Sequence, residues 1–266
     1  MLDMDSEKLL EEFKKEMILK GYSENTINSY SYTIQKLLNF LNGKKLTEEG
    51  VRDFLFDLRE SCSNNTLFTY SCQIKAFLFF CQKDFEIPFP KIEKKLPTFL
   101  TRGEIQKLFE SIDNKRDYLI IRILYATGMR VSELVELEWG NIEGNTIKIY
   151  GKGKKERIVY VDDETLKLLP PKKKKGRIFN ISVRQVEKIV KKWAKKAGIE
   201  KNVTPHTLRH TFATHLLENQ ANIIVIKDLL GHASLNTTQI YTHVTDEHRK
   251  RDYGRHPLAA GDTFAR

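Results

Sequence analysis

The chain has 266 residues, of which 40% are hydrophobic, and it carries a formal net charge of +10. This composition supplies enough apolar residues for one large or two medium folded domains and excludes wholesale disorder. No run of about 18 apolar residues occurs, so we expect neither a transmembrane helix nor a membrane partner. The acidic N-terminus lacks the apolar segment of a secretory signal, and the three cysteines have no metal-ligand spacing. We therefore expect a cytoplasmic protein with reduced thiols.

The positive charge is concentrated in the C-terminal two-thirds of the chain. Residues 1–93 hold 12 Lys and Arg against 15 Asp and Glu, a net charge of −3, which leaves +13 for the remainder. A basic region of this kind indicates a polyanionic partner, most simply nucleic acid. The alternative is a lysine-rich surface that reflects overall composition alone, as in thermophiles.

The first 84 residues contain four helical patterns, in which apolar residues recur every three or four positions. Four such helices with short connections pack as a compact bundle, so we predict a helical domain over 1–84. The predicted helices cover 6–20, the stretch from Ser23 to Leu41, the stretch from Thr47 to Leu58, and 63–80.

An interdomain linker is predicted over 85–97, because this stretch has three prolines, a charged cluster and no helical periodicity. A second domain, 98–266, then opens with a capping box from Thr101 to Glu104. Within it, a helix over 117–126 has an apolar face wide enough to indicate a central, buried position.

A β-hairpin is predicted in the second domain, because 146–150 and 157–161 alternate apolar and polar residues in the strand fashion. The short gap between them contains two glycines, which favours a tight connection. Its tip would carry Lys152, Lys154 and Lys155. Helices are predicted to follow from Ser182 to Gly198, around His206, over 223–230 and around Tyr241. The predicted fold class is therefore mainly α, an N-terminal helical bundle plus a mostly helical domain with a small antiparallel hairpin or sheet.

Six polar residues of the second domain suggest phosphate chemistry. His206 and Arg209 lie three residues apart on one predicted helix, so they share a face. Two arginines can hold the oxygens of a phosphodiester, and a lysine can protonate a leaving oxygen. A histidine can accept the proton of a tyrosine, whose hydroxyl then attacks phosphorus. The set is Arg130, Lys152, His206, Arg209, His232 and Tyr241.

Each of these residues also has an ordinary interpretation. His-x-x-Arg is found on many helix faces, Gly-His often ends a helix, and a tyrosine most often packs. His206 and His210 have the spacing of zinc ligands on a helix but lack the glutamate of a zinc protease motif, so no metal is expected. Two guanidinium groups supply the positive charge at the phosphate, and no cofactor is expected either.

In its order of residues, the chain resembles the tyrosine recombinase family of the phage-integrase type, and most of all the Xer site-specific recombinases. The strings that carry the resemblance are Tyr-Ala-Thr-Gly-Met-Arg-Val-Ser-Glu-Leu (125–134), Gly-Lys-Gly-Lys-Lys-Glu-Arg (151–157), Thr-Pro-His-Thr-Leu-Arg-His-Thr-Phe-Ala-Thr-His (204–215), Leu-Leu-Gly-His-Ala-Ser (229–234) and Thr-Thr-Gln-Ile-Tyr-Thr-His-Val (237–244). The N-terminal bundle is similar to the family's core-binding domain by pattern only.

The resemblance implies a role for each residue. Arg130, Arg209 and His232 would bind the scissile phosphate, with Glu133 supporting Arg130. His206 would exchange the proton of Tyr241, which would form a 3′-phosphotyrosine link to DNA. Lys152 would be the general acid for the 5′-hydroxyl, with Lys154 and Lys155 as rivals. DNA-binding roles are expected for Lys154, Lys155 and Arg157.

The implied function is a site-specific recombinase that acts on double-stranded DNA, self-assembles on it as a tetramer in the synapse, and resolves chromosome or plasmid dimers. The alternatives are a mobile-element integrase, a type IB topoisomerase-like relaxing enzyme, and a non-enzymatic DNA-binding module. The Leu-Leu-Gly-His string argues against the topoisomerase, and Tyr241 would have no task in the binding module. The DNA site, the need for a partner recombinase or accessory protein, and the role of 245–266 stay open.

Overall fold

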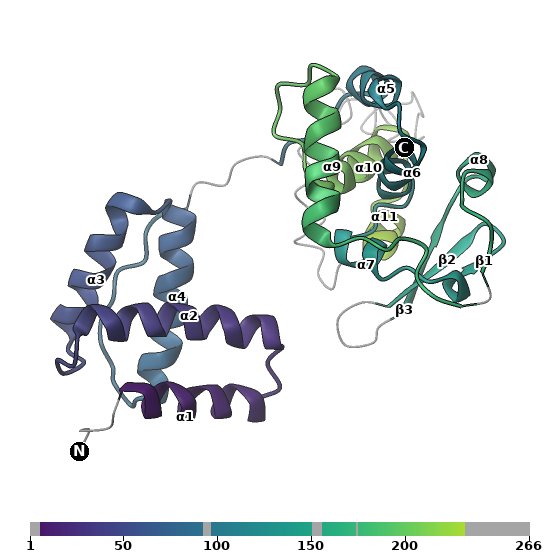
Figure 1. The fold of residues 1–266 in the computed structure, drawn as a ribbon. Coiled ribbons are helices and arrows are strands. Elements are labelled where there is room, and N and C mark those ends of the chain that lie inside the picture. The colour runs from purple at the N-terminus through teal and green to yellow at the C-terminus, as the bar shows by residue number, and fades with distance from the viewer. Residues whose placement is uncertain (1–5, 93–96, 151–155, 174, 232–266) are drawn as a thin grey trace, which may run out of the picture. The chain divides into compact units, whose positions relative to one another are not determined.

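The computed structural model describes residues 6–92, 97–150, 156–173 and 175–231, and it divides into two compact units, 1–95 and 96–266. Figure 1 shows both units as mostly helical. Within the described residues, eleven α-helices accompany one small antiparallel sheet, which confirms the predicted fold class. Of these helices, none is both long and apolar enough to span a membrane.

The first unit is a bundle of four helices, and local capping signals set where they begin. In the three helices with a serine or threonine cap, the hydroxyl accepts from the backbone N–H three residues later; these caps are Ser23, Thr47 and Ser63. The four helices are α1 (Ser6–Leu19), α2 (Glu24–Leu41), α3 (Glu48–Ser61) and α4 (Asn64–Phe80).

The bundle core is mostly apolar, and a polar link joins α2 and α4 within it. Leu37 and Phe77 are fully buried in it. Thr33, also buried, donates its hydroxyl hydrogen to the side-chain oxygen of Gln73 at 2.5 Å, and the amide nitrogen of Gln73 donates to Ser29 at 2.9 Å. A buried, satisfied link of this kind fixes the register of the two helices.

The first half of the expected linker packs along the bundle. Ile87 is buried in the bundle core. The guanidinium of Arg52 donates to the backbone carbonyl of Glu86 at 2.7 Å, and the hydroxyl of Ser71 donates to that of Pro88 at 2.9 Å. Absence of periodicity therefore does not mean absence of packing here, because backbone carbonyls and one apolar side chain anchor the segment.

The second unit is built around α6, as its apolar sequence predicts. Ile120, Ile121 and Leu124 are fully buried in the core of this unit. The helices of the unit are α5 (Arg102–Ser111), α6 (Lys115–Thr127), α7 (Val131–Val135), α8 (Asp163–Lys167), α9 (Val183–Lys196), α10 (Pro205–Glu218) and α11 (Ile223–Leu230), with a 3₁₀ turn over Trp139–Asn141.

The sheet of this unit has three antiparallel strands in the order β1-β2-β3. These are β1 (Ile142–Glu143), β2 (Thr146–Tyr150) and β3 (Glu156–Tyr160). The predicted hairpin is β2 and β3, whose register pairs Ile149 with Arg157. The sequence analysis missed β1, which is too short to show an alternating pattern.

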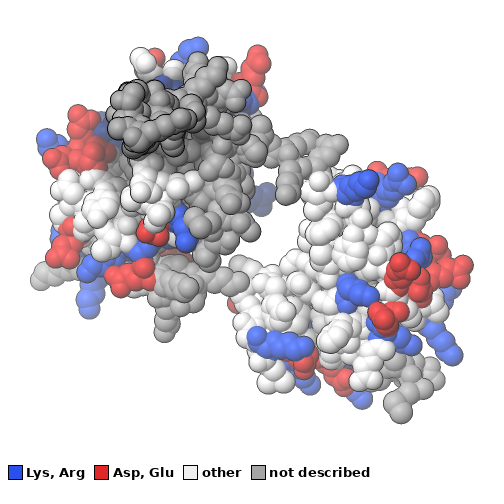
Figure 2. Space-filling view, turned by 180° about the vertical axis from the view of Figure 1, so that it is seen from behind, with Lys and Arg blue, Asp and Glu red and all other residues white. Residues whose placement is uncertain are grey.

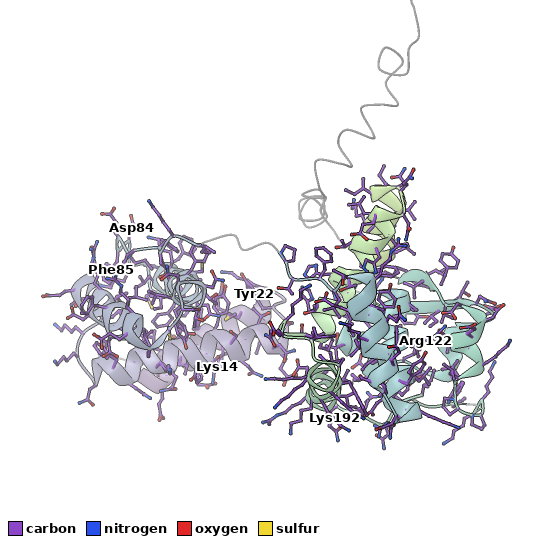
Figure 3. All side chains as sticks on the ribbon, turned by 90° about the horizontal axis from the view of Figure 1, so that it is seen from above. Lys14, Tyr22, Asp84, Phe85, Arg122 and Lys192 are labelled. Carbon is purple, nitrogen blue, oxygen red and sulfur yellow. The ribbon has the colours of Figure 1, made fainter. Side chains whose placement is uncertain are left out.

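Charge is distributed differently over the two units. On the face of the bundle seen in Figure 2, basic and acidic side chains are both scattered over a largely uncharged surface. In the second unit, α9 buries Val186, Val190 and Trp193, while its lysines are exposed on the other side. Lys192, one of these lysines, is labelled in Figure 3. The basic charge predicted for the second domain is therefore presented partly by one amphipathic helix.

Candidate active site

Gly128 ends α6 and turns the chain toward Arg130. It adopts a left-handed conformation with φ 61°, and a Cβ there would lie 2.4 Å from the ring of Phe212. Only glycine meets both conditions. Arg130 then becomes the N-cap of α7, and its backbone N–H donates to Glu133 Oε2 at 2.6 Å. The cap of this short helix is therefore supplied by a glutamate three residues on.

Glu133 also holds the side chain of Arg130. The guanidinium donates from Nη1 to Glu133 Oε1 at 3.0 Å. The carboxylate side chain is 7% exposed and the arginine side chain 42% exposed. Glu133 is thus the buried partner of the pair and Arg130 the accessible one. This arrangement is expected of a carboxylate that supports an arginine.

Arg157 lies on the other side of the same carboxylate. Its Nη1 and Nη2 donate to the two oxygens of Glu133 at 2.7 and 2.6 Å, and its side chain is 10% exposed. Arg157 was predicted to contact DNA, whereas its guanidinium faces the protein. The physical reason is strand alternation, because Arg157 shares its face of β3 with buried Val159.

The helix α10 carries His206 and Arg209. Its start is set by Thr204, whose hydroxyl caps the first turn, and by Pro205 at the first helical position. Arg209 is 2% exposed and donates to the carbonyls of Gly128 and Leu230 at 2.7 and 2.5 Å. It therefore joins the C-terminal ends of α6 and α11.

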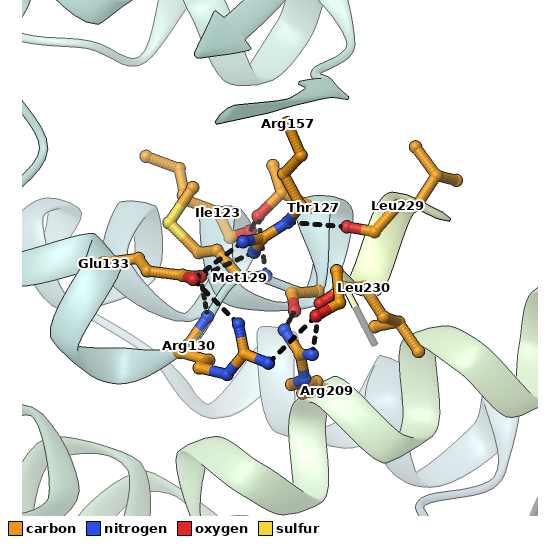
Figure 4. A network of polar contacts seen from close by, with 11 residues as sticks. Ile123, Thr127, Met129, Arg130, Glu133, Arg157, Arg209, Leu229 and Leu230 are labelled. Carbon is orange, nitrogen blue, oxygen red and sulfur yellow. Dashed lines mark hydrogen bonds and ion pairs between the residues drawn. The ribbon is translucent and has the colours of Figure 1, made fainter. Parts of the chain in front are cut away.

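Three arginines meet at the end of α11, as Figure 4 shows. The last carbonyls of a helix have no partner within it and carry the negative end of the helix dipole, so cations are favoured there. Each of three consecutive carbonyls accepts from a different arginine: Leu229 from Arg157 at 2.9 Å, Leu230 from Arg209 at 2.5 Å, and Gly231 from Arg130 at 3.4 Å. The residue that follows these carbonyls in the chain is His232.

His206 has a lowered pKa. Burial is the main cause, and the positive charges of Arg209 and Arg130 lower the pKa of the imidazole further. Its ring lies edge-on to that of His210, with 4.4 Å between the centroids. No group of three or more His, Cys, Asp or Glu side chains placed as metal ligands occurs in the described part of the chain. A neutral imidazole at this position can accept a proton.

The structure thus brings together five of the predicted site residues, Arg130, Glu133, Arg157, His206 and Arg209, with Arg157 on Glu133 instead of at the surface. The other predicted residues lie outside the described residues; they are Lys152, Lys154, Lys155, His232 and Tyr241. The row of carbonyls at the end of α11 was not predicted, since backbone acceptors leave no mark in a sequence. The inward orientation of Arg157 could have been found from the sequence, in the period-two alternation of its strand.

Comparisons of sequence support a common origin with known recombinases. The family model described as the phage integrase family matches residues 98–248, and that of a phage integrase N-terminal SAM-like domain matches 9–77. The chain is 39% identical over 261 residues to the tyrosine recombinase XerA of Pyrococcus horikoshii, covering 90% of each. It is 35% identical over 292 residues to the tyrosine recombinase XerD of Staphylococcus saprophyticus, covering 94% of this chain and 99% of the relative.

Comparisons of structure agree. A crystal structure of XerA recombinase matches with a TM-score of 0.54 at 31% identity, over 95% of this chain and 99% of the other. The XerH site-specific recombinase in its pre-cleavage complex with difH substrate matches with a TM-score of 0.72 at 27% identity, over 96% and 85%. The chain belongs to the phage integrase family of tyrosine recombinases, enzymes that cleave and rejoin DNA, and it resembles the Xer members of that family.

Proposed function

We propose that Arg130, Arg209 and His232 hold the scissile phosphate of DNA while Tyr241 attacks it. The observation that carries this proposal is the meeting of Arg130 and Arg209 at adjacent carbonyls, Gly231 and Leu230. The two arginines come from different elements, and the chain runs from these carbonyls directly into His232. Guanidinium donors fixed in this way are preorganised for an anionic oxygen.

The chemistry follows from the charge that develops at phosphorus. The Tyr241 oxygen forms a bond to phosphorus, and the bond from phosphorus to the 5′-oxygen breaks through a five-coordinate state with added charge on the non-bridging oxygens. Arg130 and Arg209 stabilise that charge. His206 takes the phenol proton, and Lys152 gives a proton to the departing 5′-oxygen. The product is a 3′-phosphotyrosine link and a free 5′-hydroxyl, and attack by a 5′-hydroxyl of the partner duplex reverses each transfer.

The lowered pKa of His206 supports its part as proton acceptor. A phenol has an ordinary pKa near 10, so it needs a base to become a good nucleophile. Burial and the two arginines hold the pKa of His206 below its ordinary 6.5, so the ring is neutral at neutral pH. A protonated ring could not accept the phenol hydrogen.

The substrate is double-stranded DNA, and the reaction is site-specific recombination of the Xer kind, which resolves chromosome or plasmid dimers in the cytoplasm. The Xer relatives support this reading by sequence, and the complexes of XerH with its difH substrate support assembly on DNA. Recombination exchanges strands between two duplexes, so several copies must assemble for one round, and a tetramer in the synapse supplies one copy for each strand.

The bundle, 1–84, and the catalytic unit, 98–266, would grip DNA together, with the stretch 85–97 connecting them. A shallow hollow of about 390 Å³ between α2 and α4 is lined by hydroxyl and amide side chains, which suit base edges and phosphates. Tyr32 is part of that lining, and Lys36 Nζ lies 5.1 Å from the centroid of its ring and adds a positive charge. The bundle would contact DNA through this face, although the bundle as a whole has a net negative charge.

The test of the nucleophile is the variant Tyr241→Phe. It removes only the hydroxyl, so DNA binding should persist and covalent joining should be lost. A nicked, end-labelled duplex traps the covalent product, which is resolved on a denaturing gel. The matched control is Tyr160→Phe, whose side chain in the same unit is 64% exposed and which should react normally. Covalent product from Tyr241→Phe at the wild-type level would refute the assignment.

A further inference from the structure

Two arginines share the carboxylate of Glu133, and they share it unequally. Each carboxylate oxygen accepts from Arg157, at 2.7 and 2.6 Å. Oε1 also accepts from the side chain of Arg130 and Oε2 from its backbone N–H. A carboxylate offers about four acceptor sites, so the four donors account for all of them. Glu133 is thereby fixed in both position and direction.

The two arginines differ in exposure and in the way each pairs with Glu133, and this difference suggests a separate role for each. Arg157 is the buried partner in fork geometry, which is the strongest form of this contact, whereas Arg130 is exposed and makes a single side-chain bond to Glu133. With Arg157 in place, the negative charge of Glu133 is already balanced, and the positive charge of Arg130 stays available to a phosphate. Without Arg157, Glu133 would compete with DNA for Arg130.

Arg157 also touches the end of α11. Its Nε donates to the carbonyl of Leu229 at 2.9 Å. Its Cδ lies 2.9 Å from the place that a Cβ on Gly231 would take, so the arginine stem packs directly against that glycine. The segment that leads into His232 therefore rests on the same side chain that holds Glu133. In the other direction along the chain, β3 begins directly after 151–155, the stretch of sequence that contains Lys152.

We propose that Arg157 is a positioning residue for cleavage, which sets Arg130 through Glu133 and the approach to His232 through Leu229 and Gly231. It acts on the phosphate through these groups and does not itself contact DNA. The proposal rests on the proposed role of Arg130 at the phosphate. It goes beyond that role because it names the side chain that holds Arg130 and the approach to His232 in their relative positions.

The first experiment compares Arg157→Lys with Arg122→Lys. Lysine keeps the charge of Arg157 but has one nitrogen, which cannot span two carboxylate oxygens and a carbonyl. Losing such an outer partner typically slows a reaction by about 10–100-fold, and we expect that loss in the rate of cleavage of a nicked duplex with DNA affinity unchanged. Arg122, on α6 (Figure 3), is the matched control because its side chain is 21% exposed and it pairs with Asp162 and Glu164. At a temperature where both variants are folded, Arg122→Lys should cleave at the wild-type rate.

A double-mutant cycle separates positioning from general stability. If Arg157 acts through Arg130, the Arg157→Lys change should cost little more in cleavage rate once Arg130→Lys is present. If Arg157 only stabilises the fold, the two losses should multiply. Multiplied losses would overturn the action of Arg157 through Arg130, and a wild-type rate for Arg157→Lys would overturn the proposal as a whole. A wild-type rate for Arg130→Lys would instead overturn the proposed function, so the two failures can be told apart.

Gly231→Ala provides a second route if Arg157→Lys does not fold. The added methyl would meet the Arg157 stem, and the position also has φ +64°. Gly198→Ala is the control, because Gly198 has φ +69° and no atom within 4 Å of the added carbon. Gly231→Ala should slow cleavage and Gly198→Ala should not, although both carry the same backbone strain. Equal cleavage rates for the two would count against a contact between Arg157 and the approach to His232.

Discussion

Replacing Arg209 by lysine should damage both stability and cleavage, whereas Arg130→Lys should damage cleavage alone. Arg209 is almost fully buried and bonds two backbone carbonyls, those of Gly128 and Leu230. A single ammonium nitrogen cannot reach both in the fork geometry of a guanidinium. One of the two carbonyls is then left unsatisfied. Arg130 is exposed, so lysine at that position leaves no comparable buried group unpaired.

The magnitudes follow from these contacts. A buried acceptor without a partner costs about 1–3 kcal/mol. In a unit of this size each kcal/mol lowers the melting temperature by roughly 2–4 °C, so Arg209→Lys should melt roughly 2–12 °C lower. Removing one preorganised donor at a developing oxyanion typically costs about 10²–10³ in rate, and we expect a loss of that order in both variants.

The assay measures two quantities on the same protein preparations. Thermal unfolding gives the change in stability, and covalent trapping on a nicked duplex gives the rate of cleavage at a temperature where each variant is folded. The wild-type rate in either variant would refute the phosphate clamp. If Arg130→Lys melted as low as Arg209→Lys, the inference that burial of Arg209 makes it the more important of the two for stability would be wrong.

Three further predictions concern pH, backbone and domain structure. Because burial and the neighbouring arginines lower the pKa of His206 from its ordinary 6.5, the midpoint of the loss of cleavage in acid should lie below pH 6.5, and a midpoint above 6.5 would argue against this base. Gly128→Ala should unfold at a much lower temperature than Gly198→Ala, because the two share a positive φ and only the first drives a methyl into Phe212; equal melting would contradict this packing. A fragment of 96–266 should fold alone, since its core is separate from that of the bundle. Failure of the fragment to fold, seen by circular dichroism, would disprove this independence. The fragment should bind DNA more weakly than the full chain but with strong salt dependence.

Local signals were sufficient to predict most helices of this fold. The capping box from Thr101 to Glu104 is present as predicted, with the threonine hydroxyl accepting at 3.2 Å and the glutamate accepting at 2.7 Å. Periodicity and caps act within one or two turns, so a sequence displays them directly. Three short elements were not predicted, because each has too few residues to show a period: the 3₁₀ turn Trp139–Asn141, β1 and α8.

Tertiary contacts account for what the sequence analysis did not foresee. Arg157 follows three lysines closely in the sequence, and charge alone favoured a role on the surface. Its partner Glu133 lies in another element, and its third acceptor is the carbonyl of Leu229, which no side-chain pattern reveals. The docking of Ile87 on the bundle has the same origin, since a proline-rich stretch shows no period even where one of its residues enters a core.

The anchoring of the arginines at a helix end has an electrostatic consequence. A carboxylate partner for every arginine would neutralise the site and weaken its attraction for DNA. Three guanidinium groups and the one carboxylate of Glu133 instead sum to +2, and the carbonyls of Leu229, Leu230 and Gly231 hold the guanidinium groups without cancelling a full charge. The partial negative charge at a helix C-terminus lowers the cost of gathering these cations before DNA arrives. Backbone dipoles and a single carboxylate therefore hold the three arginines in place, and the site keeps a net positive charge for the phosphate that we propose it binds.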